Sequence, residues 1–181
     1  MTSSGKTELY IKKISEQLQQ GKQVLYLLPE IALTNQIVKR LQKYFGNKIG
    51  VTHSYLNSSE KVEVWKSIQN KPNDKKSISV ILGARSSIFM PFNNLGLIIV
   101  DEEHDISFKQ HQRNPRYNAR DAAIYLGSLH SAKVLLGTAT PSLESYLHAR
   151  NGKYGLVEMR TRYKGIELPK IEIINIHKAY L

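Results

Sequence analysis

The strongest constraint on the fold is a run of four apolar residues that leads directly into acidic ones, L-I-I-V-D-E-E-H at residues 97–104. Four successive apolar residues predict a strand buried on both faces, as in the centre of a parallel sheet flanked by helices. Such α/β sheets bind ligands at the carboxyl ends of their strands. Asp101 is then placed to hold Mg²⁺, directly or through water, and Glu102 to orient a water for attack on a γ-phosphate. The alternative is an ordinary acidic loop after a core strand.

A second motif, near the N-terminus, favours nucleotide chemistry. Gly5-Lys6-Thr7 matches the closing half of the phosphate loop G-x-x-x-x-G-K-[ST]. In that loop backbone N–H groups surround the phosphates, the lysine reaches the β- and γ-phosphates, and the hydroxyl binds Mg²⁺. We therefore expect Ser4, Gly5, Lys6 and Thr7 to bind the phosphates of ATP, with Thr7 and Asp101 as the Mg²⁺ ligands.

The opening glycine of this loop would fall one residue before Met1. We therefore expect a nucleotide site that lacks its leading strand, is mobile over Met1 to Ser4, and stays empty in this chain alone. The gap would expose hydrogen-bonding edges in the sheet. The alternating segment Ile171 to Ile176 is the strand predicted to cover them, within one chain or between copies.

The composition fits a basic protein that binds a polyanion. The chain has 181 residues, 41% of them hydrophobic, enough for one cored domain, and a mean hydropathy of −0.36. Its 26 Lys and Arg against 15 Asp and Glu give a net charge of +11, which suggests nucleic acid as partner; a generally basic solvated surface is the alternative. No segment predicts a membrane span or a signal peptide, and the lack of cysteine excludes disulfides and thiolate metal sites. We expect a cytoplasmic protein with no membrane partner.

Apolar runs and helix-period patterns alternate along the chain, which predicts a parallel sheet with helical crossovers. The predicted strands are 24–28, 49–52, 79–82, 97–100 and 134–136. The predicted helices are one from Thr7 to Gly21, one over 37–45 capped by Thr34, one around 62–68, one after Asn118, and one from Thr140-Pro141 to about His148. We expect one domain over 1–150 and, over 151–181, a basic linker that starts a following region.

Five strand-to-loop junctions carry small, polar or charged residues in a fixed order. They are G-K-T at 5–7, L-P-E-I-A-L-T-N-Q at 28–36, G-A-R-S-S-I-F at 83–89, D-E-E-H at 101–104 and G-T-A-T-P-S at 137–142. This order resembles the first motor lobe of superfamily 2 helicases. The details P-F-N-N-L-G-L-I-I-V-D-E-E-H-D and P-R-Y-N-A-R-D resemble the bacterial primosomal, replication-restart helicases within it.

The resemblance implies a RecA-like P-loop NTPase lobe that uses ATP and Mg²⁺, with Asp101 and Glu102 as catalytic residues. Zinc would be held only by a module outside this chain. Thr138 and Thr140 would couple hydrolysis to movement by bonding the carboxylates or responding to nucleotide state; for Thr140, helix capping is the alternative or additional role. A hydrogen-bonding role is expected for His104, rather than metal binding.

The resemblance also implies contacts to a single DNA strand, made without sequence preference. The residues implied in DNA binding or coupling are Thr34, Gln36, Arg85, Ser86, Phe108, Lys109, Arg116, Tyr117 and Arg120. For Arg85 a structural ion pair is the alternative. Phe108 or Tyr117 would stack on bases, and either could instead be a core residue.

The implied function of the intact protein is 3′ to 5′ unwinding of DNA at stalled forks and initiation of primosome assembly. Its implied partners are single-stranded and forked DNA, other primosome proteins and single-stranded-DNA-binding protein. Two alternatives are kept. One is the motor lobe of another superfamily 2 DNA translocase, and the other is a nucleic-acid-binding fragment without activity of its own.

Overall fold

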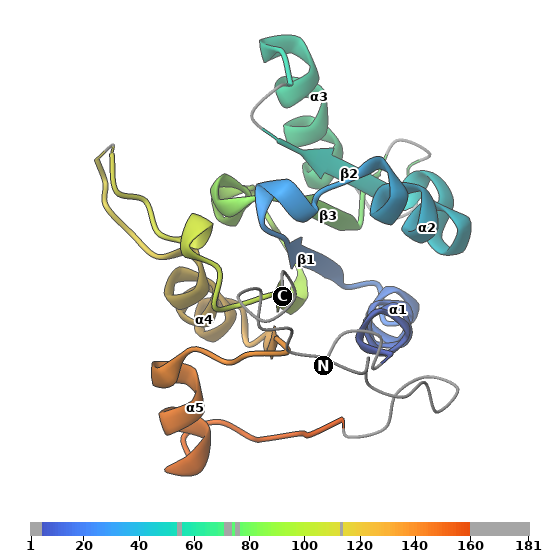
Figure 1. The fold of residues 1–181 in the computed structure, drawn as a ribbon. Helices are drawn as coiled ribbons and strands as arrows, with labels where there is room; N and C mark the ends of the chain where they lie inside the picture. Colours follow the sequence, from blue (N-terminus) through green and yellow to red (C-terminus); the bar gives the residue numbers. More distant parts are fainter. Residues whose placement is uncertain (1–4, 54–55, 71–73, 75–76, 113, 160–181) are drawn as a thin grey trace, which may run out of the picture.

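The core of the molecule is a parallel β-sheet. The computed structural model describes residues 5–53, 56–70, 74, 77–112 and 114–159, and within them the strands pair in the order β2-β3-β1-β4-β5 (Figure 1). The strands are β1 (Gln23–Leu27), β2 (Ile49–Thr52), β3 (Val80–Gly83), β4 (Leu95–Asp101) and β5 (Lys133–Gly137). All pairs are parallel. The predicted α/β class is therefore confirmed, and every predicted strand lies within two residues of the observed one.

Helices connect the strands and begin at residues suited to helix starts. They are α1 (Lys6–Gln19), α2 (Asn35–Phe45), α3 (Ser58–Gln69), α4 (Ala119–His130) and α5 (Leu143–Arg150), with short 3₁₀ turns η1 (Glu30–Ala32), η2 (Gly46–Lys48), η3 (Arg85–Phe89) and η4 (Ile106–Phe108). Asn57 and Glu60 form a capping box at α3, and the Asn118 side chain accepts from Arg120 N at the start of α4. Thr34 is the N-cap of α2, but its side chain makes no capping hydrogen bond in the described structure.

The sheet separates two hydrophobic clusters because successive strand residues point to opposite faces. Val24 and Tyr26 of β1 pack with residues of α1 and α2, such as Ile14 and Leu41. Leu25 and Leu27 face the other side and pack with residues of α3, η4 and α4, among them Ile68, Phe108 and Ala123. Figure 1 shows the resulting three layers, with α1 and α4 on opposite sides of β1.

One predicted helix start is wrong. Thr140-Pro141 was expected to be the cap and first residue of the last helix, but α5 begins at Leu143 and its N-cap is Ser142. The Ser142 hydroxyl accepts from Ser145 N at 3.3 Å. Thr140 N donates instead to Thr138 Oγ1 at 3.0 Å. The loop after β5 therefore turns locally before the helix starts, because the Thr138 hydroxyl accepts from the backbone of Thr140 and the Ser142 hydroxyl accepts from the first turn of α5.

Several predictions concern residues outside the described part of the chain. These are the phosphate-binding role of Ser4, the mobility of Met1 to Ser4, and the strand from Ile171 to Ile176. Among the described residues, no helix combines the length and the apolar character needed to cross a membrane.

The carboxyl ends of the strands meet along one edge of the sheet. Leu27 is in register with Gly83 on one side and Val100 on the other, and Asp101 is in register with Gly137. Helix α1 starts at this edge and packs across β1 and β4. The motifs at 5–7, 83–89, 101–104 and 137–142 therefore converge in space, as ligand-binding loops do in open α/β sheets.

Candidate active site

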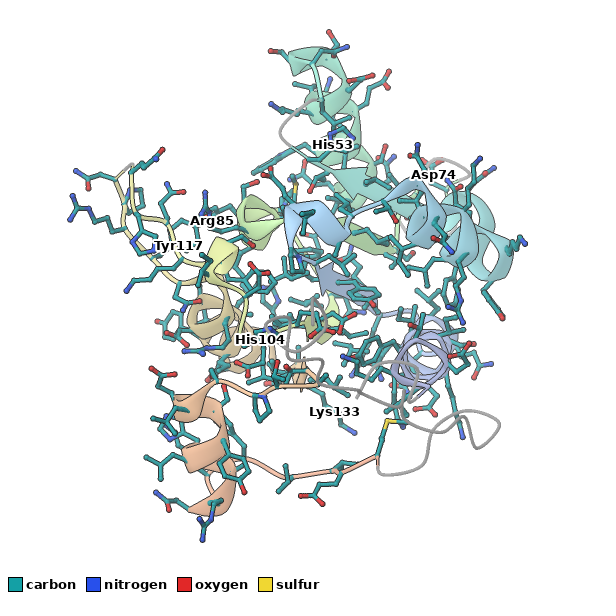
Figure 2. All side chains as sticks on the ribbon, viewed as in Figure 1. His53, Asp74, Arg85, His104, Tyr117 and Lys133 are labelled. Atoms are coloured by element: carbon teal, nitrogen blue, oxygen red, sulfur yellow. The ribbon has the colours of Figure 1, made fainter. Side chains whose placement is uncertain are left out.

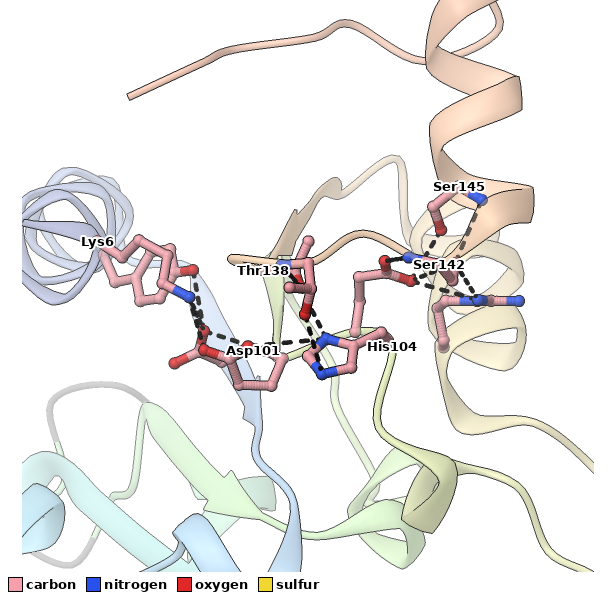
Figure 3. A network of polar contacts seen from close by, with 11 residues as sticks. Lys6, Asp101, His104, Thr138, Ser142 and Ser145 are labelled. Carbon is pink, nitrogen blue, oxygen red and sulfur yellow. Dashed lines mark hydrogen bonds and ion pairs between the residues drawn. The ribbon is translucent and has the colours of Figure 1, made fainter. Parts of the chain in front are cut away.

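Lys6 and the acidic residues after β4 form an ion-pair cluster at this edge (Figure 3). Lys6 Nζ lies 2.6 Å from Glu102 Oε1 and 3.7 Å from Asp101 Oδ1. Gly5, which precedes α1, has a φ of +83°, a left-handed conformation that glycine adopts readily. Thr7 is half-buried in the first helical turn. The G-K-T and D-E-E-H motifs, 95 residues apart in sequence from Lys6 to Asp101, thus lie next to each other, as a phosphate-binding lysine and metal-binding carboxylates must.

Two tyrosine hydroxyls hold the Asp101 carboxylate. Tyr10 OH donates to Asp101 Oδ1 and Tyr26 OH to Asp101 Oδ2, each at 3.1 Å. Burial raises the pKa of Asp101 above its ordinary value, and Glu102 adds to that effect, while Lys6 and the two phenols oppose it. Burial likewise raises the pKa of both phenols. The tyrosines are therefore protonated donors at neutral pH.

His104 connects the acidic motif to the loop after β5. His104 Nδ1 lies 2.8 Å from Thr138 Oγ1 and 3.7 Å from Glu102 Oε2. Thr140 Oγ1 lies 3.4 Å from the other ring nitrogen, Nε2. The two threonines thus contact His104, and the expected direct bonds to Asp101 or Glu102 are absent from the contacts of the described residues. Glu102 itself has a φ of +50°, which turns the chain sharply after the strand.

Glu103 points the opposite way and is buried, with 2% of its surface exposed. Its carboxylate accepts from Ser142 N at 2.7 Å, Ser142 Oγ at 2.9 Å and Ser145 Oγ at 2.8 Å, and it pairs with Arg120 at 3.3 Å. Burial pushes the pKa of Glu103 upward, but these hydrogen bonds outweigh it and hold the pKa below its ordinary value. The cluster ties the end of β4 to α4 and to the start of α5 (Figure 3).

Arg120 is therefore a structural residue. Its side chain is 13% exposed and contacts Glu103, Asp121 and Ser142. These partners hold the guanidinium inside the protein, and the role of Arg120 in DNA binding or coupling stays a prediction.

Two more predicted DNA residues have other surroundings than expected. Phe108 is 1% exposed and lies in the core, so its predicted role in base stacking is wrong and its alternative as a core residue is confirmed. Arg85 donates through Nη1 to Ser107 O at 2.9 Å and Lys109 O at 3.0 Å. Backbone carbonyls are thus among its partners, and no ion pair of Arg85 is found among the described residues.

Three other residues predicted to contact DNA, Thr34, Gln36 and Ser86, are exposed, and their contact with DNA stays a prediction.

After η4, residues 109–112 and 114–118 run alongside each other like the two arms of a hairpin. Lys109 and Asn118 form an antiparallel bridge, and Gln110 N donates to Tyr117 O at 2.8 Å. The exposed side chains of Lys109 and Arg116 border a hollow of about 330 Å³ that Tyr117 also lines. Figure 2 shows Tyr117 beside Arg85, with which it shares a side-chain hydrogen bond.

An exposed aromatic residue lies next to this hollow. Phe89, 58% exposed, meets the Tyr117 ring edge to face with centroids 5.1 Å apart. Lys109, Arg116 and Tyr117 thus lie around one hollow, and their contact with DNA stays a prediction.

Comparison with known proteins decides the family. The family model described as DEAD/DEAH box helicase matches residues 1–148. The chain belongs to the DEAD/DEAH box helicase family. The fold is accordingly that of a RecA-like lobe, as predicted. A solved helicase structure, RecG bound to a three-way DNA junction, shares the fold with a TM-score of 0.55 and 24% identity over 82% of this chain and 18% of that one.

Curated relatives of this helicase chain are replication restart proteins named PriA. Identity is 42% to the protein of Bacillus subtilis and 46% to that of Chlamydia pneumoniae, each over 98% of this chain, and 47% to that of Rickettsia typhi over 100%. The predicted resemblance to replication-restart helicases is confirmed. The chain spans 21%, 23% and 27% of the length of these relatives.

The donor set at the edge of the sheet suits the magnesium nucleotide that helicases of this family imply. Mg²⁺ prefers oxygen ligands and is usually held by one or two carboxylates together with substrate phosphates. The Thr7 hydroxyl and the Asp101 carboxylate provide oxygens, and Lys6 provides the charge that phosphates require. Among the described residues there is no group of three His, Cys, Asp or Glu side chains that could hold a metal alone. The residues therefore fit a metal that arrives with its nucleotide.

Sequence reasoning missed the supporting residues of this helicase site. Tyr10 and Tyr26 were read only as parts of an apolar helix face and an apolar strand. Tyr10 lies one helical turn after Lys6, however, and that spacing places both on the same side of α1. Glu103 and Ser142 could have been found as candidate site residues because they lie inside the D-E-E-H and G-T-A-T-P-S motifs.

Proposed function

We propose that this chain is the ATP-binding motor lobe of a bacterial replication-restart DNA helicase, in which ATP hydrolysis drives 3′ to 5′ movement along single-stranded DNA. The observation that carries this proposal is the placement of Lys6 against Asp101 and Glu102 at the carboxyl edge of the sheet. A lysine from a phosphate-loop motif and two carboxylates after a buried strand are the parts that phosphoryl transfer requires.

The reaction is the transfer of the γ-phosphoryl group of ATP to water. Lys6 is freed from its 2.6 Å contact with Glu102 when it turns to the β- and γ-phosphates. Glu102 then orients the attacking water and accepts its proton, while the bond from the γ-phosphorus to the ADP oxygen breaks. Thr7 and Asp101 would hold Mg²⁺, which when bound neutralises charge on the phosphates.

Coupling to DNA would use the two polar connections that leave the acidic motif. His104 contacts Thr138 and Thr140, so a change at Glu102 is passed to the loop after β5. η4 and the hairpin-like segment of 109–112 and 114–118 follow D-E-E-H directly in the chain. Arg85 anchors both through the carbonyls of Ser107 and Lys109. A conformational change at the nucleotide site would therefore reach the DNA-binding surface, and a change at the DNA-binding surface would reach the nucleotide site.

The DNA-binding surface would consist of exposed and half-buried residues on the same edge of the sheet. We assign to it Thr34, Gln36, Ser86, Lys109, Arg116 and Tyr117, with the remaining N–H groups of Arg85. The net charge of +11 supports a polyanionic partner, and the RecG protein of similar fold was solved on a DNA junction.

For the protein as a whole we propose the restart of replication at stalled forks, as the names of the relatives suggest. Single-stranded and forked DNA, other primosome proteins and single-stranded-DNA-binding protein would be its partners, in the cytoplasm. Residues 1–150 would form the motor lobe and 151–181 the start of a following region. Any zinc would belong to a module outside this chain.

The test is ATP hydrolysis and fork unwinding by the full-length protein. We expect hydrolysis that single-stranded DNA stimulates, and unwinding that requires a 3′ to 5′ track. Lys6→Ala should lower turnover about 10²- to 10³-fold, as loss of a group that stabilises the transition state does. Lys12→Ala, an exposed lysine of the same helix, is the matched control and should leave turnover unchanged. Hydrolysis without unwinding would point to another kind of DNA translocase, and DNA-independent turnover at wild-type rates in Lys6→Ala would refute the assignment.

A further inference from the structure

The Asp101 carboxylate is held by two tyrosines that no motif of the chain explains. Tyr10 comes from α1 and Tyr26 from β1, and their hydroxyls reach different oxygens of the same carboxylate, each at 3.1 Å. The two rings meet edge to face, with centroids 5.6 Å apart and an interplanar angle of 80°. Tyr10 is 1% exposed and Tyr26 is 0% exposed. The rings are therefore fixed by packing, and so are the positions of their hydroxyls.

A third element leaves room for this arrangement. A Cβ atom at Gly137, the last residue of β5, would lie 1.7 Å from Tyr10 OH and 3.5 Å from Asp101 Oδ1. Only glycine allows the phenol to reach the carboxylate by this route, because any other residue would place a side-chain atom on the hydroxyl. Elements α1, β1, β4 and β5 thus all contribute to the geometry at Asp101.

The hydrogen bonds also decide which side of Asp101 is available. A carboxylate has about four acceptor positions, two on each oxygen. Oδ1 accepts from Tyr10 OH and from Glu102 N, the latter at 3.1 Å, whereas Oδ2 accepts from Tyr26 OH. Among the described residues, one acceptor position of Oδ2 therefore has no protein hydrogen-bond donor.

We propose that Tyr10 and Tyr26 are positioning residues that hold the Asp101 carboxylate in one orientation and present Oδ2 to the metal, or to a metal-bound water, of the bound nucleotide. This inference rests on the proposed function, since it takes Asp101 as the carboxylate that holds Mg²⁺. A metal ligand that is already oriented loses less freedom on binding, and hydrogen-bond partners of metal ligands typically change affinity 10- to 100-fold when removed.

The experiment measures metal binding directly. Tyr10→Phe, Tyr26→Phe and the double variant each keep the buried ring and remove only hydroxyl groups. In the full-length protein, Mn²⁺ is titrated in place of Mg²⁺ in the presence of a non-hydrolysable ATP analogue, and free Mn²⁺ is followed by electron paramagnetic resonance. Affinity for the analogue is measured separately in the presence of a chelator, and urea unfolding reports on the fold. Tyr125→Phe, at a tyrosine that is 68% exposed on α4, is the matched control.

We expect each single variant to weaken Mn²⁺ binding about 3- to 10-fold and the double variant about 10- to 100-fold. Metal-free analogue binding should stay within about twofold of wild type, because Lys6 and the phosphate loop are unchanged, and Tyr125→Phe should match wild type throughout. Wild-type Mn²⁺ affinity in the double variant would overturn the inference, as would an equal loss of analogue affinity with and without metal. If the double variant does not fold, the single variants decide on the same criteria. A wild-type protein that binds neither analogue nor metal would instead overturn the proposed function, and this inference with it.

Discussion

Neutralising Glu103 should cost far more stability than neutralising the other carboxylate that Arg120 contacts. The comparison is Glu103→Gln against Asp121→Asn, two replacements of a carboxylate by an amide of similar size. Arg120 lies 3.3 Å from Glu103 and 2.9 Å from Asp121, yet Glu103 has a side chain that is 1% exposed and Asp121 one that is 61% exposed. The two sites therefore differ in burial and in the hydrogen bonds that the carboxylate accepts.

The magnitude follows from the contacts. Glu103 accepts three hydrogen bonds from Ser142 and Ser145, in addition to its ion pair with Arg120. Glutamine retains one oxygen for the backbone N–H of Ser142, but its amide N–H₂ group faces donors instead of accepting from them. Removing one partner of a buried ion pair costs about 3–5 kcal/mol, and a hydrogen bond to a charged group contributes about 1.5–3 kcal/mol. We expect Glu103→Gln to lose about 3 kcal/mol of unfolding free energy, and Asp121→Asn to lose less than about 1 kcal/mol.

Urea unfolding at several pH values is the assay. Because the folded pKa of Glu103 is below the unfolded value of about 4.5, its carboxylate contributes stability that is fully present above pH 4.5. That contribution is lost as the pH falls through the lower, folded pKa. The difference between wild type and Glu103→Gln should thus be constant near neutral pH and shrink in acid. Equal small losses in the two variants, or a difference that does not change in acid, would refute the reasoning.

Three further predictions concern a core residue, an aromatic residue predicted to contact DNA, and the close contact at Gly137. Phe108→Ala should lower the free energy of unfolding by about 3–5 kcal/mol, measured in urea, because it empties a core position; a loss below about 1 kcal/mol would contradict its burial. Tyr117→Ala should weaken single-stranded DNA binding by about 1–3 kcal/mol in fluorescence titrations without changing the salt dependence, and an altered salt slope would argue against stacking. Gly137→Ala should cost about 1–3 kcal/mol of stability in the same urea assay, since the new methyl group meets the hydroxyl of Tyr10; wild-type stability would show that the strand can shift.

The fold and the catalytic motifs could be predicted because their signals are local. The run from Leu97 to Val100 has the pattern of a doubly buried strand, and β4 is buried over all but its last residue. Parallel strands end at one edge, so the sequence order of the motifs was enough to place Lys6 near Asp101 and Glu102. These predictions needed no knowledge of side-chain contacts.

The supporting contacts could not be predicted because they depend on tertiary neighbours. Phe108 follows a charged motif and precedes Lys109, so its sequence context resembles that of an exposed loop, yet η4 turns it into the core between α4 and the sheet. Arg120 starts an exposed-looking helix, and only the fold brings Glu103 to it. In the same way Ser142, rather than Thr140, is the N-cap of α5, and its backbone N–H donates to Glu103, a partner that only the fold brings near. Local patterns indicate which residues are polar, but not which partners they find.

The most direct test of the central claim separates ATP binding from ATP hydrolysis in the Glu102→Gln variant of the full-length protein. Binding is measured by equilibrium titration with ATP, and hydrolysis by single-turnover phosphate release in the presence of single-stranded DNA. If Glu102 orients the attacking water, the variant should bind ATP at least as tightly as wild type, since Lys6 loses a competing carboxylate, while the rate of phosphate release falls about 10²- to 10³-fold. Phosphate release at the wild-type rate would contradict the assignment of this edge of the sheet as the site of hydrolysis.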